Sequence, residues 1–326
     1  MQELVSRTFG ERPVDLLRWR YETGPWRTDR IVLWDEYGEA VGFLGAVFGE
    51  CWIDGRDATV SVHGDLLVDG HRGQGGGSML LETALARDPC EARYAFPAGS
   101  AASLIGRFGT PLKGKLQQWV RWLSPSAIAT SRGRLPRSGR SLVAVVLQAV
   151  SLLAGTHRRW EVTRITDPGE EVDDLAARSA AFARCILRRD AAYLRWRWLD
   201  QPGGRWTMLG VRDGDGRLRG ITVEGMKEGE MHGPSPVGRI GDLLADGPTA
   251  TRVLLDAATR TLESNGCGIV LLDLNDPRPW SRSACVRAGF LPRGRGPNVH
   301  LAGLPGSDAA RDLDSWYLTL GDTDLA

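Results

Sequence analysis

The chain has 326 residues, 42% of them hydrophobic and 25% charged, which is the composition of an ordinary globular protein. This length suits two domains and exceeds that of one ordinary α+β domain. Because 41 basic residues are balanced by 40 acidic ones, the net charge of +1 gives no overall positive field for nucleic acid.

The N-terminus and the cysteines predict a cytoplasmic protein. The first residues lack the basic segment and apolar core of an export signal. The number of cysteines is odd and none has C-x-x-C spacing, which favours reduced thiols over disulfides or a zinc site. The cysteines are Cys51, Cys90, Cys185, Cys267 and Cys285.

The first predicted element is a helix of alternating aromatic and basic residues, and the second half of the chain repeats it. Residues 17–21 read LRWRY and residues 194–198 read LRWRW, a spacing of 177. Residues 64–70 read GDLLVDG and residues 241–247 read GDLLADG, at the same spacing. Further segments align at nearly this spacing, which predicts a duplicated domain.

Both copies show the same order of predicted elements. The first helix ends before a proline, because the residue preceding proline disfavours the α region. Apolar runs around residues 35–38, and again around 213–216, predict a β-hairpin. The next elements, in the first and second copy, are a strand (59–68; 239–244), a helix (78–87; 250–264), a strand (93–96; 268–274) and a helix ending at Gly109 or Gly289.

The two copies are separated by a polar stretch and an apolar one. Residues 124–140 are rich in Ser, Arg, Pro and Gly, which is typical of a loop. The apolar run at 142–154 is too short to span a membrane, so a buried or interdomain helix is favoured over a helix on a membrane surface. We expect a first domain at 1–130, a linker with an apolar helix at 131–157 and a second domain at 158–326. The role of the segment 141–155 stays open.

The second copy begins with an additional strand and helix, at residues 159–165 and 170–182. The first copy begins almost directly at its aromatic and basic helix. Its sheet is therefore expected to lack an edge strand, or to borrow one from elsewhere in the chain.

A glycine-rich turn at residues 68–81, between a predicted strand and helix, is the most informative run of the first copy. Glycines permit positive φ and close approach of the backbone. Such a turn directs several backbone N–H groups and the positive end of a helix at one point, which suits a pyrophosphate. The spacing matches neither the P-loop nor the dinucleotide fingerprint.

The run RGQGGG at residues 72–77 resembles the Arg-x-x-Gly-x-Gly signature of the GCN5-related N-acetyltransferase (GNAT) family. The later helix that ends in Gly-Phe, at residues 289–290, is similar to the family too. The resemblance implies an α+β fold with two tandem GNAT-like domains, each a twisted mixed sheet flanked by helices. It also implies acetyl-CoA or another acyl-CoA as co-substrate, with its pyrophosphate in the turn and its pantetheine arm along the preceding strand. The implied cofactor contacts are Leu67, Val68, Arg72, Gly73, Gln74, Gly75, Gly76, Gly77, Ser78 and Ser103.

The second copy lacks the features of this turn. It is three residues shorter there, has neither the arginine nor the glycines, and places Pro248 where a donor N–H is needed. We therefore expect one coenzyme A per chain, bound by the first copy. The second copy is expected to shape the acceptor pocket or to brace the first.

Acyl transfer to an amine needs a base, a stabilised oxyanion and a proton for the leaving thiolate. His63 and Asp65 lie two apart on a predicted strand and are expected to face the same side, where either is a candidate base. Asp242 repeats Asp65 in the copy without the turn, which equally favours a structural hydrogen bond. The resemblance places the usual tyrosine acid at Ile105, so the acid stays open, with Tyr94 as a substitute and catalysis by proximity as the alternative.

The expected function is acyl-CoA-dependent transfer to a small amine, by a monomer or homodimer. Three alternatives stay open: an aminoacyl transferase of the peptidoglycan type that uses aminoacyl-tRNA, an acyl-CoA decarboxylase, and a non-catalytic coenzyme A-binding protein. The intact turn and the neutral net charge disfavour the first. The aromatic and basic helices are more typical of packing than of nucleic-acid binding, and no histidine has a partner at metal-ligand spacing.

Overall fold

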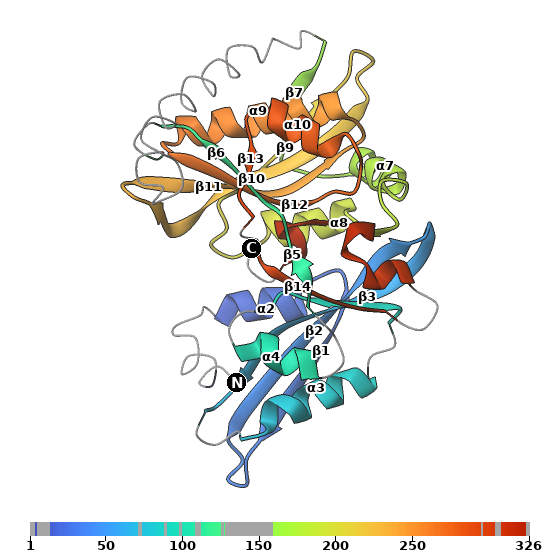
Figure 1. Cartoon of the computed structure of the whole chain (residues 1–326), viewed down its shortest axis with the longest axis vertical. Coiled ribbons are helices and arrows are strands. Elements are labelled where there is room, and N and C mark those ends of the chain that lie inside the picture. The colour runs from blue at the N-terminus through green and yellow to red at the C-terminus, as the bar shows by residue number, and fades with distance from the viewer. Residues whose placement is uncertain are drawn as a thin grey trace.

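The computed structural model describes residue 4 and residues 14–70, 74–87, 90–97, 100–107, 112–124, 127, 159–294, 296–303 and 308–323. The strands of these residues join in one mixed 15-stranded sheet. Figure 1 shows two lobes, with the first half of the chain below and the second half above. The predicted α+β fold is confirmed, with helices on the faces of a twisted mixed sheet.

From the aromatic and basic helix of each copy to its last exchanged strand, the elements follow in the same order, and the second half has additional elements before and after them. The first half contains α2 (Val14–Glu22), β1 (Arg27–Trp34), β2 (Ala40–Ile53), β3 (Arg56–Val68), α3 (Gly76–Arg87), β4 (Ala92–Ala95), α4 (Ser100–Arg107), β5 (Leu112–Lys115) and β6 (Gln118–Trp122). The second half contains β7 (Glu161–Ile165), α7 (Glu170–Ser179), β8 (Cys185–Leu187), α8 (Ala191–Leu194), η1 (Arg195–Leu199), β9 (Trp206–Arg212), β10 (Leu218–His232), β11 (Ser235–Ala245), α9 (Pro248–Ser264), β12 (Ile269–Asn275), α10 (Ser281–Arg287), β13 (Leu291–Pro292) and β14 (Asn298–Gly303). After β14 come η2 (Asp308–Arg311), η3 (Leu313–Ser315), β15 (Trp316–Thr319) and η4 (Leu320–Asp322).

The last strands of the two copies are exchanged. β6 of the first copy pairs antiparallel with β12 and β13 of the second, from Ile269↔Trp122 to Asp273↔Gln118. In return, β14 of the second copy pairs antiparallel with β4 and β5 of the first. Figure 1 shows β6 in the upper lobe and β14 in the lower. The part of the sheet in each lobe is thus completed by a strand from the other half of the chain.

The first copy is expected to lack an edge strand or to borrow one, and among the described residues β1 pairs only with β2, so no strand takes that edge. β7 pairs with β9 in the second copy, and no counterpart of it pairs with β1 in the described part of the first. The borrowed strand β14 instead lies against β4, beyond β3.

The two aromatic and basic helices meet at the centre of the molecule. The indole Nε1 of Trp19 donates to the carbonyl of Trp196 at 2.7 Å, and the Nε1 of Trp196 donates to the carbonyl of Trp19 at 2.9 Å. The two rings stack with their centroids 5.1 Å apart. Equivalent residues that contact one another reciprocally are the mark of a two-fold interface. The two copies therefore pack as the subunits of a symmetric dimer do, and the packing interpretation of these helices is confirmed.

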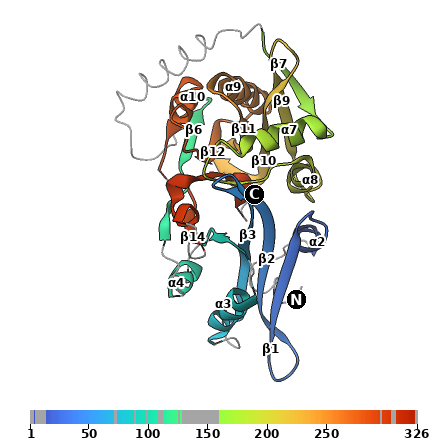
Figure 2. The same ribbon diagram turned by 90° about the vertical axis from the view of Figure 1, so that its right-hand side faces the viewer.

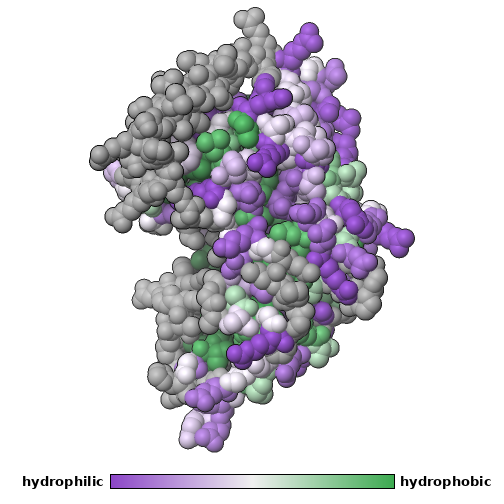
Figure 3. Space-filling view, viewed as in Figure 1, coloured by the Kyte–Doolittle hydropathy of each residue, from purple (hydrophilic) through white to green (hydrophobic). Residues whose placement is uncertain are grey.

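The described surface and the cysteine side chains have the properties of an ordinary globular protein. On the face seen in Figure 3, hydrophilic residues predominate and hydrophobic ones form only small separate patches. All five cysteines are free and buried. No helix in the described ranges has the length and apolarity needed to cross a membrane. The predicted apolar helix at 142–154 lies outside the described residues.

Candidate functional site

The N-terminus of α3 begins in the glycine-rich turn, and its glycines have different physical roles. Gly75 has φ +79°, and a Cβ there would meet no atom within 4 Å. A Cβ on Gly76 would lie 2.6 Å from Leu33, and one on Gly77 would lie 2.7 Å from Leu104. Gly75 therefore sets the turn, whereas Gly76 and Gly77 let α3 approach β1 and α4 closely.

The described part of the turn leaves the first N–H groups of α3 pointing out of the helix, as in any helix start. The N–H groups of Ser78 and Met79 donate to the carbonyl of Gly75, at 3.1 and 3.3 Å. Gln74 to Ser78 thus lie together at one helix end. His71, Arg72 and Gly73 lie outside the described residues.

β3 and β4 separate beside this helix end. Their parallel pairing stops at Val62↔Tyr94, while β3 continues to Val68. In the described ranges no strand pairs with this last part of β3 on its β4 side. The side chain of Leu67 is 2% exposed and packs with Tyr21 and Phe43, so only its backbone faces the gap between the strands.

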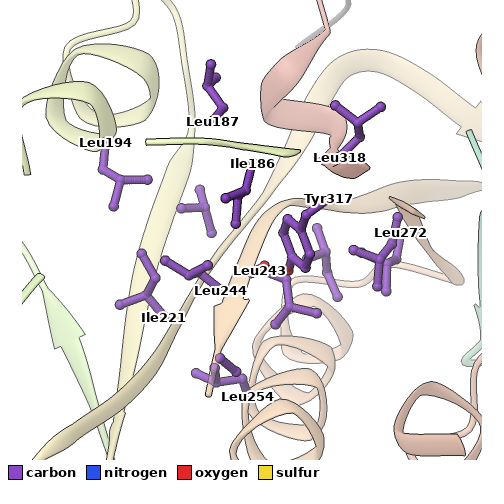
Figure 4. Close-up of a cluster of buried hydrophobic side chains, with 14 of the residues drawn as sticks. Ile186, Leu187, Leu194, Ile221, Leu243, Leu244, Leu254, Leu272, Tyr317 and Leu318 are labelled. Atoms are coloured by element: carbon purple, nitrogen blue, oxygen red, sulfur yellow. Dashed lines mark hydrogen bonds between the residues drawn. The ribbon is translucent and has the colours of Figure 1, made fainter. Parts of the chain in front are cut away.

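The equivalent gap in the second copy is filled by the chain itself. Pairing of β11 with β12 stops at Ile240↔Leu272, and β15 then pairs with the end of β12 at Leu274↔Thr319. Figure 4 shows Tyr317 of β15 beside Leu243 of β11.

Side chains of β15 and of the β12–α10 loop also occupy backbone acceptors of β11. The hydroxyl of Tyr317 donates to the carbonyl of Leu243, and Arg278 donates to the carbonyl of Ala245 at 2.6 Å. These carbonyls correspond to Leu66 and Val68 of the first copy. Because α9 starts at Pro248, soon after β11 ends, the second copy also has no turn comparable with that of the first.

A buried ion cluster holds the filling segment in place. Arg189 has no exposed surface and donates to Asp242 at 2.9 Å, to Asp322 and to the hydroxyl of Thr319 at 3.2 Å. The N–H of Thr319 donates to Asp322 at 2.6 Å. Burial raises the pKa of the Asp322 carboxyl above its ordinary value, although Arg189 opposes the shift.

The expectation that His63 and Asp65 face the same side is wrong. The β2–β3 register passes from Phe43↔Leu67 to Gly45↔Gly64, so Asp65 lies in a bulge, with φ +52°. A bulge breaks the regular alternation of side chains along a strand.

The bulge turns Asp65 toward α2, where it accepts hydrogen bonds from Arg20 at 2.7 Å and from the hydroxyl of Tyr21 at 2.9 Å. His63 lies on the other face, beside Leu81 and Ala84 of α3. Figure 2 shows α2 on one side of β2 and β3, with α3 and α4 on the other.

Burial raises the pKa of Tyr21 well above its ordinary value, and the neighbouring Asp65 adds to this effect. The Arg20–Asp65 pair is largely buried, with 12% and 4% of the side chains exposed. Asp242 is likewise held by a buried arginine. The structural hydrogen bond inferred from the repeat is therefore present in both copies.

The α3 face of the first copy holds the remaining predicted positions. Ser103 is exposed on α4, and its neighbour Leu104 contacts Gly77 as described above. Ile105 and His63 line one cavity of about 380 Å³ between α3, α4 and β14. In the described residues no group of three or more potential ligands could hold a metal ion.

A second cavity, of about 440 Å³, lies between the lobes on the α2 face of β3. We call it the interlobe cavity. Its lining residues are Arg20, Tyr21, Trp26, Val47, Val62, Gly64, Tyr94, Leu187, Tyr193, Trp196, Arg197, Gly321, Asp322 and Thr323. Sequence reasoning did not single out Trp26, Tyr193 or Asp322, because no motif surrounds them.

Several solved structures have a fold similar to that of this chain. A GCN5-related N-acetyltransferase from Kribbella flavida is 15% identical, with a TM-score of 0.57, over 94% of this chain and 70% of that one. One from Anabaena variabilis is 13% identical, with a TM-score of 0.59, over 94% and 70%. The chain has the GNAT fold.

A third similar structure is the N-myristoyltransferase of Saccharomyces cerevisiae with bound myristoyl-CoA. It is 12% identical, with a TM-score of 0.54, over 92% of this chain and 78% of that one. No protein-family model and no curated protein matches the sequence. At such identities the likeness is one of fold. Because it extends over both copies, it includes the paired arrangement as well as the single GNAT unit.

Proposed function

We propose that this GNAT-fold protein is an acyl-CoA-dependent N-acyltransferase that binds one acyl-CoA per chain and acts on a small amine. The observation that carries the proposal is the contrast between the two gaps. In the first copy β3 separates from β4 beside a glycine-rich helix start, and in the second copy β15 occupies the same place. A solved structure of similar fold contains bound myristoyl-CoA.

The residues of the first copy fit such a ligand. The first N–H groups of α3 and the open space at Gly75 suit a pyrophosphate, to which Arg72 and Gly73 would add. The backbone of Leu67 and Val68 would bind the pantetheine arm. Ser103 of α4, next to the Leu104 that contacts Gly77, would provide a further contact. When bound, acyl-CoA supplies the thioester, and acetyl-CoA is the donor that we propose first. We also propose a cytoplasmic location, which the reduced cysteines support.

Calorimetric titration with acetyl-CoA is expected to give one site per chain. Gly75→Asp is expected to weaken this binding at least about a hundredfold, because the new carboxylate opposes the pyrophosphate. Aspartate tolerates positive φ and is favourable at a helix N-terminus, so the variant is expected to fold.

Gly55→Asp is the matched control for this titration. Gly55 has φ +75° and also has no atom within 4 Å of its Cβ position. It lies in the β2–β3 hairpin, at the opposite end of β3 from the turn, so the variant carries the same backbone strain and the same charge at a remote position. Two equal sites, or no binding by the unmodified protein, would contradict the proposal and favour the aminoacyl-tRNA alternative or a structural role.

The base is proposed to be Asp65, with His63 as the alternative, and their opposite faces make the two separable. If Asp65 is the base, Asp65→Asn should lower kcat by about a hundredfold or more with little change in acetyl-CoA affinity. Tyr21→Phe removes one hydrogen bond to Asp65 and keeps the carboxylate. The decrease in kcat of this variant therefore measures how much of the effect comes from the hydrogen bonding of Asp65 and not from its loss as a base. His63→Ala should then leave the pH profile of kcat unchanged. The reverse pattern would assign the base to His63.

A further inference from the structure

The walls of the interlobe cavity are mostly aromatic and aliphatic. The rings of Trp26 and Tyr193 stack with centroids 4.7 Å apart, and Trp196 is tilted against both at about 6 Å. These residues come from both copies, so only the complete chain forms the cavity. Aromatic faces attract flat apolar groups and cations, especially where water is excluded.

Two side chains that line this cavity each have a polar atom without a partner. Within the described residues, neither the hydroxyl of Tyr94 nor Oδ1 of Asp322 makes a hydrogen bond, although both side chains are buried. Asp322 is close enough to contribute to the raised pKa of Tyr94, which is due first to burial. Burying a polar group without a hydrogen-bond partner costs folding free energy. Two such groups in one cavity are explained if the cavity binds a ligand that supplies their partners.

The cations around the cavity are already engaged. Arg20 binds Asp65, and Arg197 donates to the carbonyls of Gly321 and Thr323. The Oδ2 atom of Asp322 is bound by Arg189, so its buried Oδ1 is the acceptor that is left without a donor in a residue of the cavity lining. A ligand that supplies an ammonium group would satisfy it, and a second anion would not.

The cavity also adjoins the proposed acyl-CoA gap. Val62 and Gly64 of β3 form part of its wall, and Val62 is the last residue of β3 that pairs with β4. An amine in the cavity is therefore next to the strand along which the thioester arm would lie.

We propose that the interlobe cavity is the acceptor site and that it takes a compact aryl-alkyl primary amine, with the ring against Trp26, Tyr193 and Trp196 and the ammonium group between Asp322 and Tyr94. This assignment of the acceptor class rests on the proposed acyltransferase function. It favours arylalkylamines over aminosugars and amino acids, because most of the lining is apolar and the other polar side chains of the wall already bind within the chain. Arg20 and Tyr21 bind Asp65, and Arg197 and Tyr193 bind the carbonyl of Gly321.

The test is titration of the full chain, both free and saturated with coenzyme A, with 2-phenylethylamine and with glucosamine. Phenylethylamine is expected to bind at least about tenfold more tightly than glucosamine. Tyr94→Phe is expected to weaken phenylethylamine binding about three- to tenfold, and Asp322→Asn at least about tenfold. Tyr94→Phe should fold normally, because the hydroxyl that it removes has no partner. Tyr37→Phe, at a hairpin residue that is 80% exposed, is the matched control.

The outcomes separate this inference from the proposed function. Coenzyme A binding without phenylethylamine binding, or with Tyr94→Phe behaving like Tyr37→Phe, would overturn the acceptor assignment and leave the acyltransferase proposal standing. Phenylethylamine binding that depends on Tyr94, in a chain that binds no coenzyme A, would support the amine site and contradict the acyltransferase proposal. Tighter binding of glucosamine would overturn the substrate class.

Discussion

Arg189→Met is expected to lower the free energy of unfolding by about 3–5 kcal/mol, enough to prevent folding in a protein of ordinary stability. The guanidinium group is fully buried between Asp242 and Asp322, which have no exposed surface themselves. Removing it leaves two carboxylates close together without a cation in the interior. Methionine retains most of the length and volume of the arginine side chain. The loss of stability therefore reflects removal of the charge and not the creation of a cavity. Urea denaturation followed by circular dichroism measures the change.

The adjacent arginine is the control for this substitution. Arg188 pairs with Glu50 and Asp57, whose side chains are 57% and 80% exposed, and lies over the ring of Trp52. Exposed ion pairs contribute little, so Arg188→Met should cost no more than about 1 kcal/mol. Equal effects of the two substitutions would show that the Arg189 cluster does not hold β15 in the gap of the second copy.

The repeat and the order of elements could be predicted from sequence because they depend on local signals. Alternating apolar residues, hairpin turns and helix ends recur within a few residues of one another, and both copies carry them. The turn at Gly75 was also predictable, since a positive φ favours glycine. These signals sufficed to locate the candidate cofactor site.

Features that depend on distant parts of the chain could not be predicted. β6 and β14 are short strands, and nothing in their residues says which sheet they join. The bulge turns the Asp65 side chain to the face opposite that of His63, whereas strict alternation places both on the same face. Asp322 belongs to the candidate acceptor site only because the C-terminal segment folds back into the second copy.

These observations suggest why the second copy has no glycine-rich turn. Once β15 and Tyr317 occupy the gap between β11 and β12, the acceptors of β11 are satisfied within the chain. The same segment then presents Gly321 to Thr323 to the interlobe cavity. The segment that fills the gap of the second copy thus also forms part of the wall of the interlobe cavity.

Separate expression of residues 1–130 and 158–326 is expected to give two fragments that are insoluble alone and that associate when expressed together. Without the second fragment, β4 loses β14, and without the first, β12 loses β6. Each fragment would expose the edge of an incomplete sheet, which favours aggregation. Together they can restore both sheets without a covalent connection. Co-purification through a tag on one fragment, followed by light scattering, measures the association.

Weakening the reciprocal tryptophan contact tests the same association of the two fragments by a single substitution. Trp19→Ala in the first fragment should weaken association by about 3–5 kcal/mol, since Trp19 is 4% exposed and packs on Trp196. Trp34→Ala, at a residue that is 59% exposed, should leave association unchanged. A soluble, folded and monomeric fragment 1–130 would contradict the strand exchange, because it would mean that β6 can complete the sheet of its own copy. The exchange instead predicts that neither half reaches its native structure without the other.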